Sequence, residues 1–233
     1  MELHMGGIVI LVGAYGSGKT EVAVNLAAHM RYKGRRVRIA DLDLVNPYFR
    51  TREARHALSN LGIEVVLPPT QFMHADLPIL DPKVAGMIRS PADLTLLDVG
   101  GDDAGATVLA ALADAFDGKA FHLLQVINPH RPYTDTVDGC LLIRRQIESK
   151  AKMTITGIVG NANFIEETTA DDIVSGYAFC RKVADAANVP LMFVTAAKTL
   201  LTRLDKKAIQ CPILPVNRQL TPPWIRAENF GSD

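Results

Sequence analysis

Eight residues near the start of the chain have the types and the order that bind the phosphates of a nucleotide. The segment Gly13-Ala-Tyr-Gly-Ser-Gly-Lys-Thr20 matches the pattern GxxxxGK followed by Ser or Thr. Glycines let such a loop fold so that its amide hydrogens point at phosphate oxygens, and the helix that follows adds its positive end. The lysine supplies a positive charge to the β- and γ-phosphates, and the threonine hydroxyl reaches Mg²⁺. The predicted nucleotide ligands are Gly13, Tyr15, Gly16, Ser17, Gly18, Lys19, Thr20 and Glu21, with Lys19 also catalytic and Thr20 also a Mg²⁺ ligand.

Acidic residues end two of the apolar segments that follow this loop. Asp41 and Asp43 end one segment, and Asp98 ends another, shortly before Gly100-Gly101. In α/β folds, ligands bind outside the carboxyl ends of the strands. An aspartate at such a place can hold Mg²⁺ directly or through water, and a nearby glycine amide can contact the γ-phosphate. We predict Asp43 and Asp98 as Mg²⁺ ligands and Gly101 as a nucleotide contact; the alternative is that each aspartate only caps the next turn.

The segment directly after Asp43 carries two arginines. It reads Asn46-Pro-Tyr-Phe-Arg-Thr-Arg-Glu53, and Arg50 and Arg52 could contact a γ-phosphate, a substrate or a partner. The alternative interpretation is an exposed helix face, with the two aromatic residues of the segment packed beneath it.

A second unusual segment, Ile127-Asn-Pro-His-Arg-Pro-Tyr-Thr134, also follows an apolar run. Its Asn-Pro and Arg-Pro pairs predict a rigid turn. His130 and Arg131 could line the site beside the nucleotide, and a purely structural loop is the alternative.

The elements that position these residues are short apolar runs alternating with segments of helical spacing. Runs rich in β-branched residues fit strands buried on both faces of a parallel sheet. The alternation predicts an α/β fold: a doubly wound, mostly parallel sheet with helices on both faces. Residues 1–233 are predicted to form a single domain, with 221–233 as a C-terminal tail. Strands are expected at 7–12, 36–40, 63–67, 94–99, 121–127, 154–159, 191–195 and 212–216, and helices at 19–33, 46–60, 81–89, 104–116, 134–150 and 169–187.

Composition excludes several classes of protein. The 233 residues are 48% hydrophobic and 21% charged, which excludes disorder by composition. With 25 basic and 25 acidic residues the net charge is zero, so the chain has no global field for nucleic acid or an anionic membrane. The three cysteines are far apart without CxxC spacing, which disfavours a disulfide framework, a zinc site and an iron–sulfur site. No signal peptide and no apolar run near 18 residues is found, and a cytoplasmic protein is expected.

Over residues 7–217 the sequence resembles the SIMIBI class of P-loop NTPases, in its MinD/ParA/CobQ-like branch. Asp-Leu-Asp43 is similar to the strand end whose second aspartate positions the hydrolytic water in that branch. Leu96-Leu-Asp-Val-Gly-Gly101 resembles its Walker B strand, and Ile158-Val-Gly-Asn161 resembles the strand end whose asparagine contacts the base. The resemblance implies a Mg²⁺-dependent ATP-binding protein in which Asp43 is catalytic and Asn161 is a base ligand.

The sequence departs from that branch at two places, the phosphate loop and the C-terminal segment, and it also lacks a guanine signature. Ala14 replaces the signature lysine of the loop. The loop sequence is closer to those of the nickel-chaperone GTPases UreG and HypB and of the signal recognition particle GTPases. The resemblance implies that a nucleotide-dependent homodimer is possible, but the lysine that mediates such a dimer in that branch is missing here. Asn161-Ala-Asn163-Phe164 lacks the lysine and aspartate of the guanine signature NKxD, which favours adenine over guanine. The amphipathic C-terminal helix of MinD is missing, so no membrane targeting is expected.

Three functions remain open at this stage. The favoured one is a slow ATPase that acts as a switch or assembly factor with an unknown protein partner. The second is an ATP-dependent small-molecule kinase or synthetase, in which Arg50, Arg52, His130 and Arg131 could line a substrate pocket. The third, a GTPase metallochaperone, is disfavoured because the chain lacks a CxxC or histidine-rich tract and the guanine signature.

Overall fold

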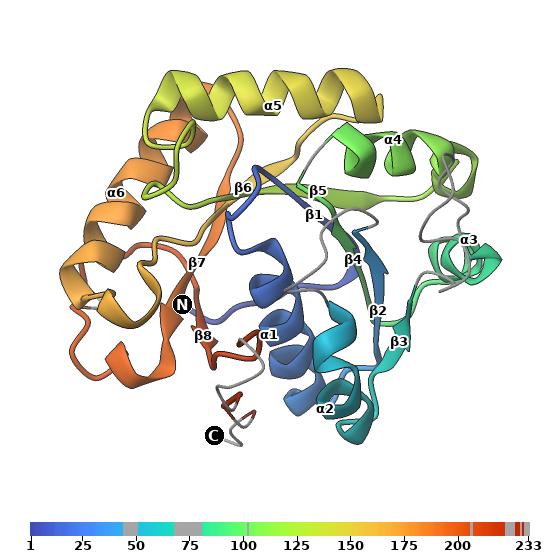
Figure 1. Cartoon of the computed structure of the whole chain (residues 1–233), viewed down its shortest axis with the longest axis horizontal. Helices are drawn as coiled ribbons and strands as arrows, with labels where there is room; N and C mark the ends of the chain where they lie inside the picture. Colours follow the sequence, from blue (N-terminus) through green and yellow to red (C-terminus); the bar gives the residue numbers. More distant parts are fainter. Residues whose placement is uncertain are drawn as a thin grey trace.

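The computed structural model describes residues 1–43, 51–67, 81–101, 103–205, 207–221, 227–228 and 230, with the backbone alone at 52, 103 and 104. In these segments eight strands form one sheet in the order β3-β2-β4-β1-β5-β6-β7-β8, and every neighbouring pair is parallel (Figure 1). The strands are β1 (Gly7–Val12), β2 (Val37–Leu42), β3 (Glu64–Val66), β4 (Leu94–Val99), β5 (Phe121–Ile127), β6 (Gly157–Gly160), β7 (Leu191–Ala197) and β8 (Ile213–Val216).

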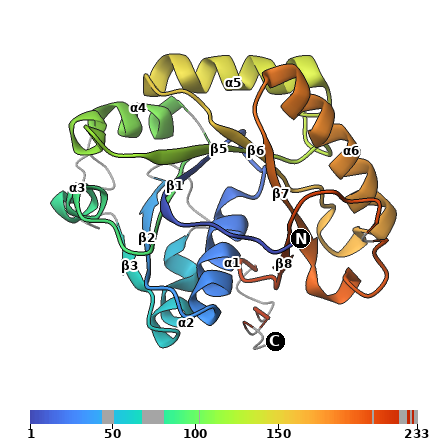
Figure 2. The ribbon, with the colours of Figure 1, turned by 180° about the vertical axis from the view of Figure 1, so that it is seen from behind.

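Helices cover both faces of this sheet, as Figures 1 and 2 show from opposite sides. One face carries α1 (Lys19–Tyr32) and α2 (Arg55–Asn60). The other carries α3 (Pro82–Arg89), α4 (Asp103–Ala111), α5 (Val137–Ala151) and α6 (Ala170–Ala187). The predicted doubly wound α/β fold is therefore confirmed.

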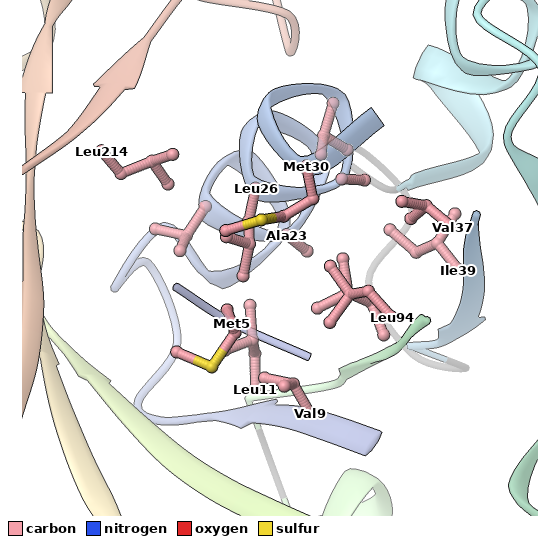
Figure 3. Packing of buried hydrophobic residues seen from close by; sticks show 14 of the residues in the cluster. Met5, Val9, Leu11, Ala23, Leu26, Met30, Val37, Ile39, Leu94 and Leu214 are labelled. Atoms are coloured by element: carbon pink, nitrogen blue, oxygen red, sulfur yellow. The ribbon is translucent and has the colours of Figure 1, made fainter. Parts of the chain in front are cut away.

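Alternate side chains of the central strand β1 divide between two hydrophobic cores, because successive residues of a strand point to opposite faces. Val9 and Leu11 belong to the core under α1, whereas Ile8 and Ile10 belong to the core under α3 and α4. Figure 3 shows Leu26 of α1 above β1 in the first core. Burying each such aliphatic side chain stabilises the fold by about 1.5–3 kcal/mol. The two cores hold β1 rigidly, and the chain leaves β1 directly into the predicted phosphate loop.

Three helices differ from their predicted ranges. In the helix expected at 46–60, residues 46–50 lie outside the described residues, and the rest forms a 3-10 turn at Thr51–Ala54 followed by α2. Helix α5 starts at Val137 rather than at 134, because the extended Thr136 caps it by accepting a hydrogen bond from the Gly139 amide. The helix expected at 104–116 ends at Ala111, and a 3-10 turn over Ala113–Phe116 follows it.

None of the helices in the described segments is both long enough and apolar enough to cross a lipid bilayer.

Candidate nucleotide-binding site

The predicted phosphate loop connects β1 to α1 in a conformation that requires glycine. Gly13 has a φ of 147°, and a Cβ there would lie 2.4 Å from the Val126 carbonyl oxygen of β5. Gly18, the N-cap of α1, has a φ of 86°, and a Cβ there would lie 2.2 Å from the side-chain nitrogen of Asn161. The loop is thus pressed against the ends of β5 and β6, with the positive end of the α1 dipole behind it.

Lys19 and Gly101 meet at this loop. Lys19 is the first residue of α1 and is 7% exposed, and its Nζ donates a hydrogen bond to the Ala14 carbonyl at 3.1 Å. A Cβ added to Gly101, just after β4, would lie 2.7 Å from that Nζ and 2.9 Å from the Tyr15 amide nitrogen. The loop after β4 therefore lies directly against the phosphate loop, and the contact of Gly101 with a γ-phosphate stays a prediction.

Gly101→Ala is expected to weaken nucleotide binding by about three- to tenfold, or about 0.7–1.4 kcal/mol, because the added methyl group displaces Lys19 or the loop backbone. Isothermal titration of both proteins measures the change. Gly86→Ala on α3 is the matched control, because no atom lies within 4 Å of its Cβ position. Equal affinity of Gly101→Ala and the parent protein would contradict the contact between Gly101 and the bound phosphates.

Three aspartates lie near the carboxyl ends of the neighbouring strands β2 and β4. Asp41 and Asp98 are register partners, and each is 1% exposed. Asp41 Oδ1 accepts a hydrogen bond from the Asp43 amide at 3.0 Å, so the capping alternative describes Asp41. Asp43 is 7% exposed and lines the cavity described below. The hydroxyl of Thr51 donates to Asp98 Oδ2 at 2.8 Å, whereas Asp98 Oδ1 is buried without a hydrogen-bond partner in the described residues.

Burial raises the pKa of Asp98 to about 7, and the neighbouring Asp41 carboxylate adds to the increase. The hydroxyls of Thr51 and Thr20 and the ammonium group of Lys19 act in the opposite direction. A cation bound beside Asp98 would therefore stabilise the ionised form of this carboxyl group.

The donor atoms fit Mg²⁺, which prefers oxygen ligands and keeps several waters or phosphate oxygens in its shell. Asp98 Oδ1 supplies a buried oxygen without a hydrogen-bond partner, and the Thr20 hydroxyl lies close enough to affect its pKa. The described residues contain no cluster of three or more His, Cys, Asp or Glu side chains with metal-binding geometry. A metal ion here would therefore complete its shell with nucleotide phosphates and water.

Asn161 joins three elements at the other side of the loop. Its Nδ2 donates to the Ser17 carbonyl at 2.7 Å, and its Oδ1 accepts from the Thr195 hydroxyl of β7 at 2.5 Å. The amide nitrogen of a side chain carries two hydrogens, so one remains for a ligand. Asn161 lines the cavity, where a base contact stays a prediction.

A cavity of about 720 Å³ brings most of the predicted residues together. Its phosphate end is lined by Tyr15, Gly16, Gly18, Lys19, Thr20, Glu21, Asp43 and Gly101. The rest of the cavity is lined by residues of β7 and β8 and of the segments after β6, β7 and β8, among them Asn161, Ile165, Glu166, Ile173, Thr195, Leu200, Val216, Arg218, Leu220 and Glu228. Gly13, Ser17 and Asp98 are buried and do not reach its surface.

Of the four further side chains predicted near the site, one lines the cavity. The Arg131 side chain lies against the loop, with its Nε 3.6 Å from the Cβ position of Gly16. His130 instead stacks on Phe164, with 3.9 Å between ring centroids. Arg50 and the side chain of Arg52 lie outside the described residues.

The sequence did not predict two hydrogen bonds of the site, from the Thr51 hydroxyl to Asp98 and from the Thr195 hydroxyl to Asn161. Both are buried hydroxyls whose partners lie more than 30 residues away, and no local spacing marks such a pair. Nor did the sequence predict that the segment after β8 lines the cavity.

Solved structures of three nucleotide-binding proteins share this architecture. Cell division protein FtsY of Thermotoga maritima has a TM-score of 0.54 at 17% identity, over 83% of this chain and 63% of its own. The signal recognition particle 54 kDa protein of Aeropyrum pernix, in complex with GDP, has a TM-score of 0.51 at 20% identity, over 82% and 41%. A nucleotide-binding protein of Archaeoglobus fulgidus, in complex with ADP, has a TM-score of 0.50 at 21% identity, over 84% of each chain.

FtsY and the 54 kDa protein are signal recognition particle GTPases, which belong to the SIMIBI class of P-loop NTPases. This chain is similar to these proteins in fold, a parallel α/β sheet with helices on both faces. It spans about three fifths of the length of several FtsY chains, 58% to 63% of each. At these identities the likeness to SIMIBI proteins is one of fold. The sequence matches no protein-family model and no curated protein.

Proposed function

We propose that this protein binds Mg²⁺–ATP in the 720 Å³ cavity and hydrolyses it slowly, as a nucleotide-dependent switch or assembly factor for a protein partner. The observation that carries the proposal is the close packing of the phosphate loop, Lys19 and Gly101 at one end of that cavity. Its volume lies within the range of about 300–1,000 Å³ that is usual for small-ligand sites.

Each residue of the phosphate end then has a role. The loop amides and Lys19 hold the β- and γ-phosphates. Thr20 and Asp98 would hold Mg²⁺, which neutralises phosphate charge when bound. Asp43 accepts a hydrogen bond from the attacking water and orients it. Arg131 makes no ion pair in the described part of the chain, so its guanidinium is available to the phosphates.

The choice of ATP rests on the sequence, because Asn161 and Asn163 are not followed by the residues of the guanine signature. The fold is compatible with either purine, since the similar structures include one with GDP and one with ADP.

Isothermal titration calorimetry with Mg²⁺–ATP and Mg²⁺–GTP tests the proposal. Tighter binding of ATP is expected. Lys19→Ala should lower ATP affinity at least tenfold, which corresponds to about 1.4 kcal/mol, because it removes the charge on the phosphates. Equal or tighter GTP binding would overturn the assignment of ATP, and unchanged affinity of Lys19→Ala would show that the loop is not the phosphate site.

A switch and a small-molecule kinase or synthetase differ in what ATP does to the protein. A nucleotide-dependent change of oligomeric state, measured by sedimentation with and without ATP, supports the switch. Transfer of phosphate to a small molecule, with no change of oligomeric state, would support the kinase or synthetase instead; of its expected pocket residues that the structure describes, Arg131 lines the cavity and His130 stacks on Phe164.

A further inference from the structure

Two side chains of α1 hold the chain directly after β8. We call the segment Asn217–Leu220 the strap. Glu21 accepts hydrogen bonds from two strap amides, with Oε1 2.8 Å from the Gln219 nitrogen and Oε2 3.0 Å from the Leu220 nitrogen. Asn25, one helical turn later, pairs with the backbone of Asn217 in both directions, donating to its carbonyl at 3.1 Å and accepting from its amide at 2.9 Å. Four hydrogen bonds thus fix the strap to the helix that begins at the phosphate loop.

The two side chains also support each other. Asn25 Nδ2 donates to Glu21 Oε1 at 2.8 Å, and Asn25 is 3% exposed. Every oxygen of the Glu21 carboxylate therefore has a protein donor. Glu21 lines the cavity, and both oxygens of its carboxylate accept hydrogen bonds from the strap, whereas its predicted contact with a nucleotide stays a prediction.

The strap forms part of the wall of the cavity. Arg218 and Leu220 line the cavity, and the Arg218 guanidinium pairs with Glu166 of the segment after β6. The Arg218 amide donates to Glu228 Oε2 at 2.8 Å, which ties a later segment to the same wall. The strap therefore spans from α1 to the segment after β6.

This end of the cavity has the chemistry of a nucleoside site. Ile173, Val216 and Leu220 provide apolar surface for a flat ring, and Arg218 and Glu166 provide a polar rim. Since the phosphates are held at the loop, a bound nucleotide would direct its ribose and base here.

We propose that Glu21 and Asn25 are positioning residues for nucleoside recognition, because they hold the strap as the wall against which the ribose and base pack. This inference rests on the proposed function. Without the two side chains, the strap amides lose their acceptors and the wall must be ordered at the moment of binding, which lowers affinity. The phosphate contacts do not involve the strap, so they should persist.

The test compares Mg²⁺–ATP with inorganic tripolyphosphate plus Mg²⁺, a ligand that has the phosphates and no nucleoside. Calorimetry is run on the parent protein, Glu21→Ala, Glu21→Gln and the control Glu167→Ala, which removes an exposed carboxylate outside the cavity. Glu21→Ala is expected to lower ATP affinity at least tenfold, about 1.4 kcal/mol, and to change tripolyphosphate affinity less than twofold. Glu21→Gln, which keeps the side-chain volume and one acceptor oxygen, should lose less.

Several outcomes would overturn the inference. An equal loss for both ligands would mean that Glu21 acts on the phosphate end, and unchanged ATP affinity would mean that the strap does not position the nucleoside. If Glu21→Ala does not fold, judged by its thermal melt, the comparison passes to Glu21→Gln and to Arg218→Ala, which should also weaken ATP selectively. Failure of the parent protein to bind either ligand would overturn the proposed function itself.

Discussion

Asp98→Asn is expected to lower the affinity for Mg²⁺–nucleotide at least about a hundredfold, some 2.7 kcal/mol, and to stabilise the nucleotide-free protein at pH 8. The first effect follows because a neutral amide replaces the carboxylate whose buried Oδ1 fits Mg²⁺. The second follows because burial and Asp41 raise the pKa of Asp98 to about 7, so ionisation of this side chain opposes folding.

The sign of the pH dependence is fixed by that shift. Between about pH 4 and pH 7 the folded protein binds a proton on Asp98 that the unfolded chain has released. The free energy of unfolding of the parent protein should therefore fall as the pH rises through this window, by up to about 1.4 kcal/mol per pH unit from this group. Denaturant titrations at pH 5.5 and pH 8 measure the fall, which should be smaller in Asp98→Asn.

Asp41→Asn is the matched control for this substitution. It removes the neighbouring carboxylate but keeps Asp98, and its amide oxygen can still accept the Asp43 amide hydrogen. It should retain Mg²⁺-dependent nucleotide binding. Parent-like binding by Asp98→Asn would end the assignment of Asp98 to the metal.

Asp43→Asn is expected to hydrolyse ATP at least about tenfold more slowly while its affinity for Mg²⁺–ATP changes less than about threefold. Orienting the attacking water matters chiefly in the transition state, so its loss lowers kcat and spares binding. Asp43 lines the cavity together with Lys19 and Gly101, which suits this role. Single-turnover hydrolysis with excess protein, combined with calorimetry, gives both quantities.

This pair of measurements also separates the two roles predicted for Asp43. If Asp43 were a Mg²⁺ ligand, the affinity for Mg²⁺–ATP would fall together with the rate. Unchanged hydrolysis by Asp43→Asn, from a parent protein that is active, would exclude Asp43 from both roles.

The sheet was predictable from the sequence because a buried parallel strand leaves a continuous apolar run. Gly7–Val12, a central strand, is an example. The phosphate loop was predictable because its chemistry requires fixed residue types at fixed spacing. The start of α5 was missed, although Thr136 has the residue type of an N-cap. An alanine-rich segment carries no stop signal, so the break after Ala111 was not predictable from spacing. In the 3-10 turn after this break, Phe116 packs edge-on against Phe121 of β5, with 5.3 Å between the ring centroids. This contact is tertiary, so the local spacing of residues does not reveal it.

The site was less predictable where its contacts join distant parts of the chain. Arg131 could be proposed because its turn follows a strand, but the loop that presents it depends on the buried Asn128, which accepts from Thr134 and donates to Asn163. Glu21 was predicted as a nucleotide ligand, whereas its strap partners, which lie almost 200 residues later, were not predicted. Hydrogen bonds of that separation leave no periodic signal in a single sequence.

The strap has a consequence for the order in which the protein becomes competent during synthesis. Strands β5 to β8 lie side by side in the sheet in chain order, and β8 is the last of the eight described strands to be synthesised. Asn25 and Asn217 are 192 residues apart, and the helix that follows the phosphate loop gains its strap partners only after β8 has docked. A nascent chain therefore carries the phosphate-binding motif well before it can complete the proposed nucleoside wall.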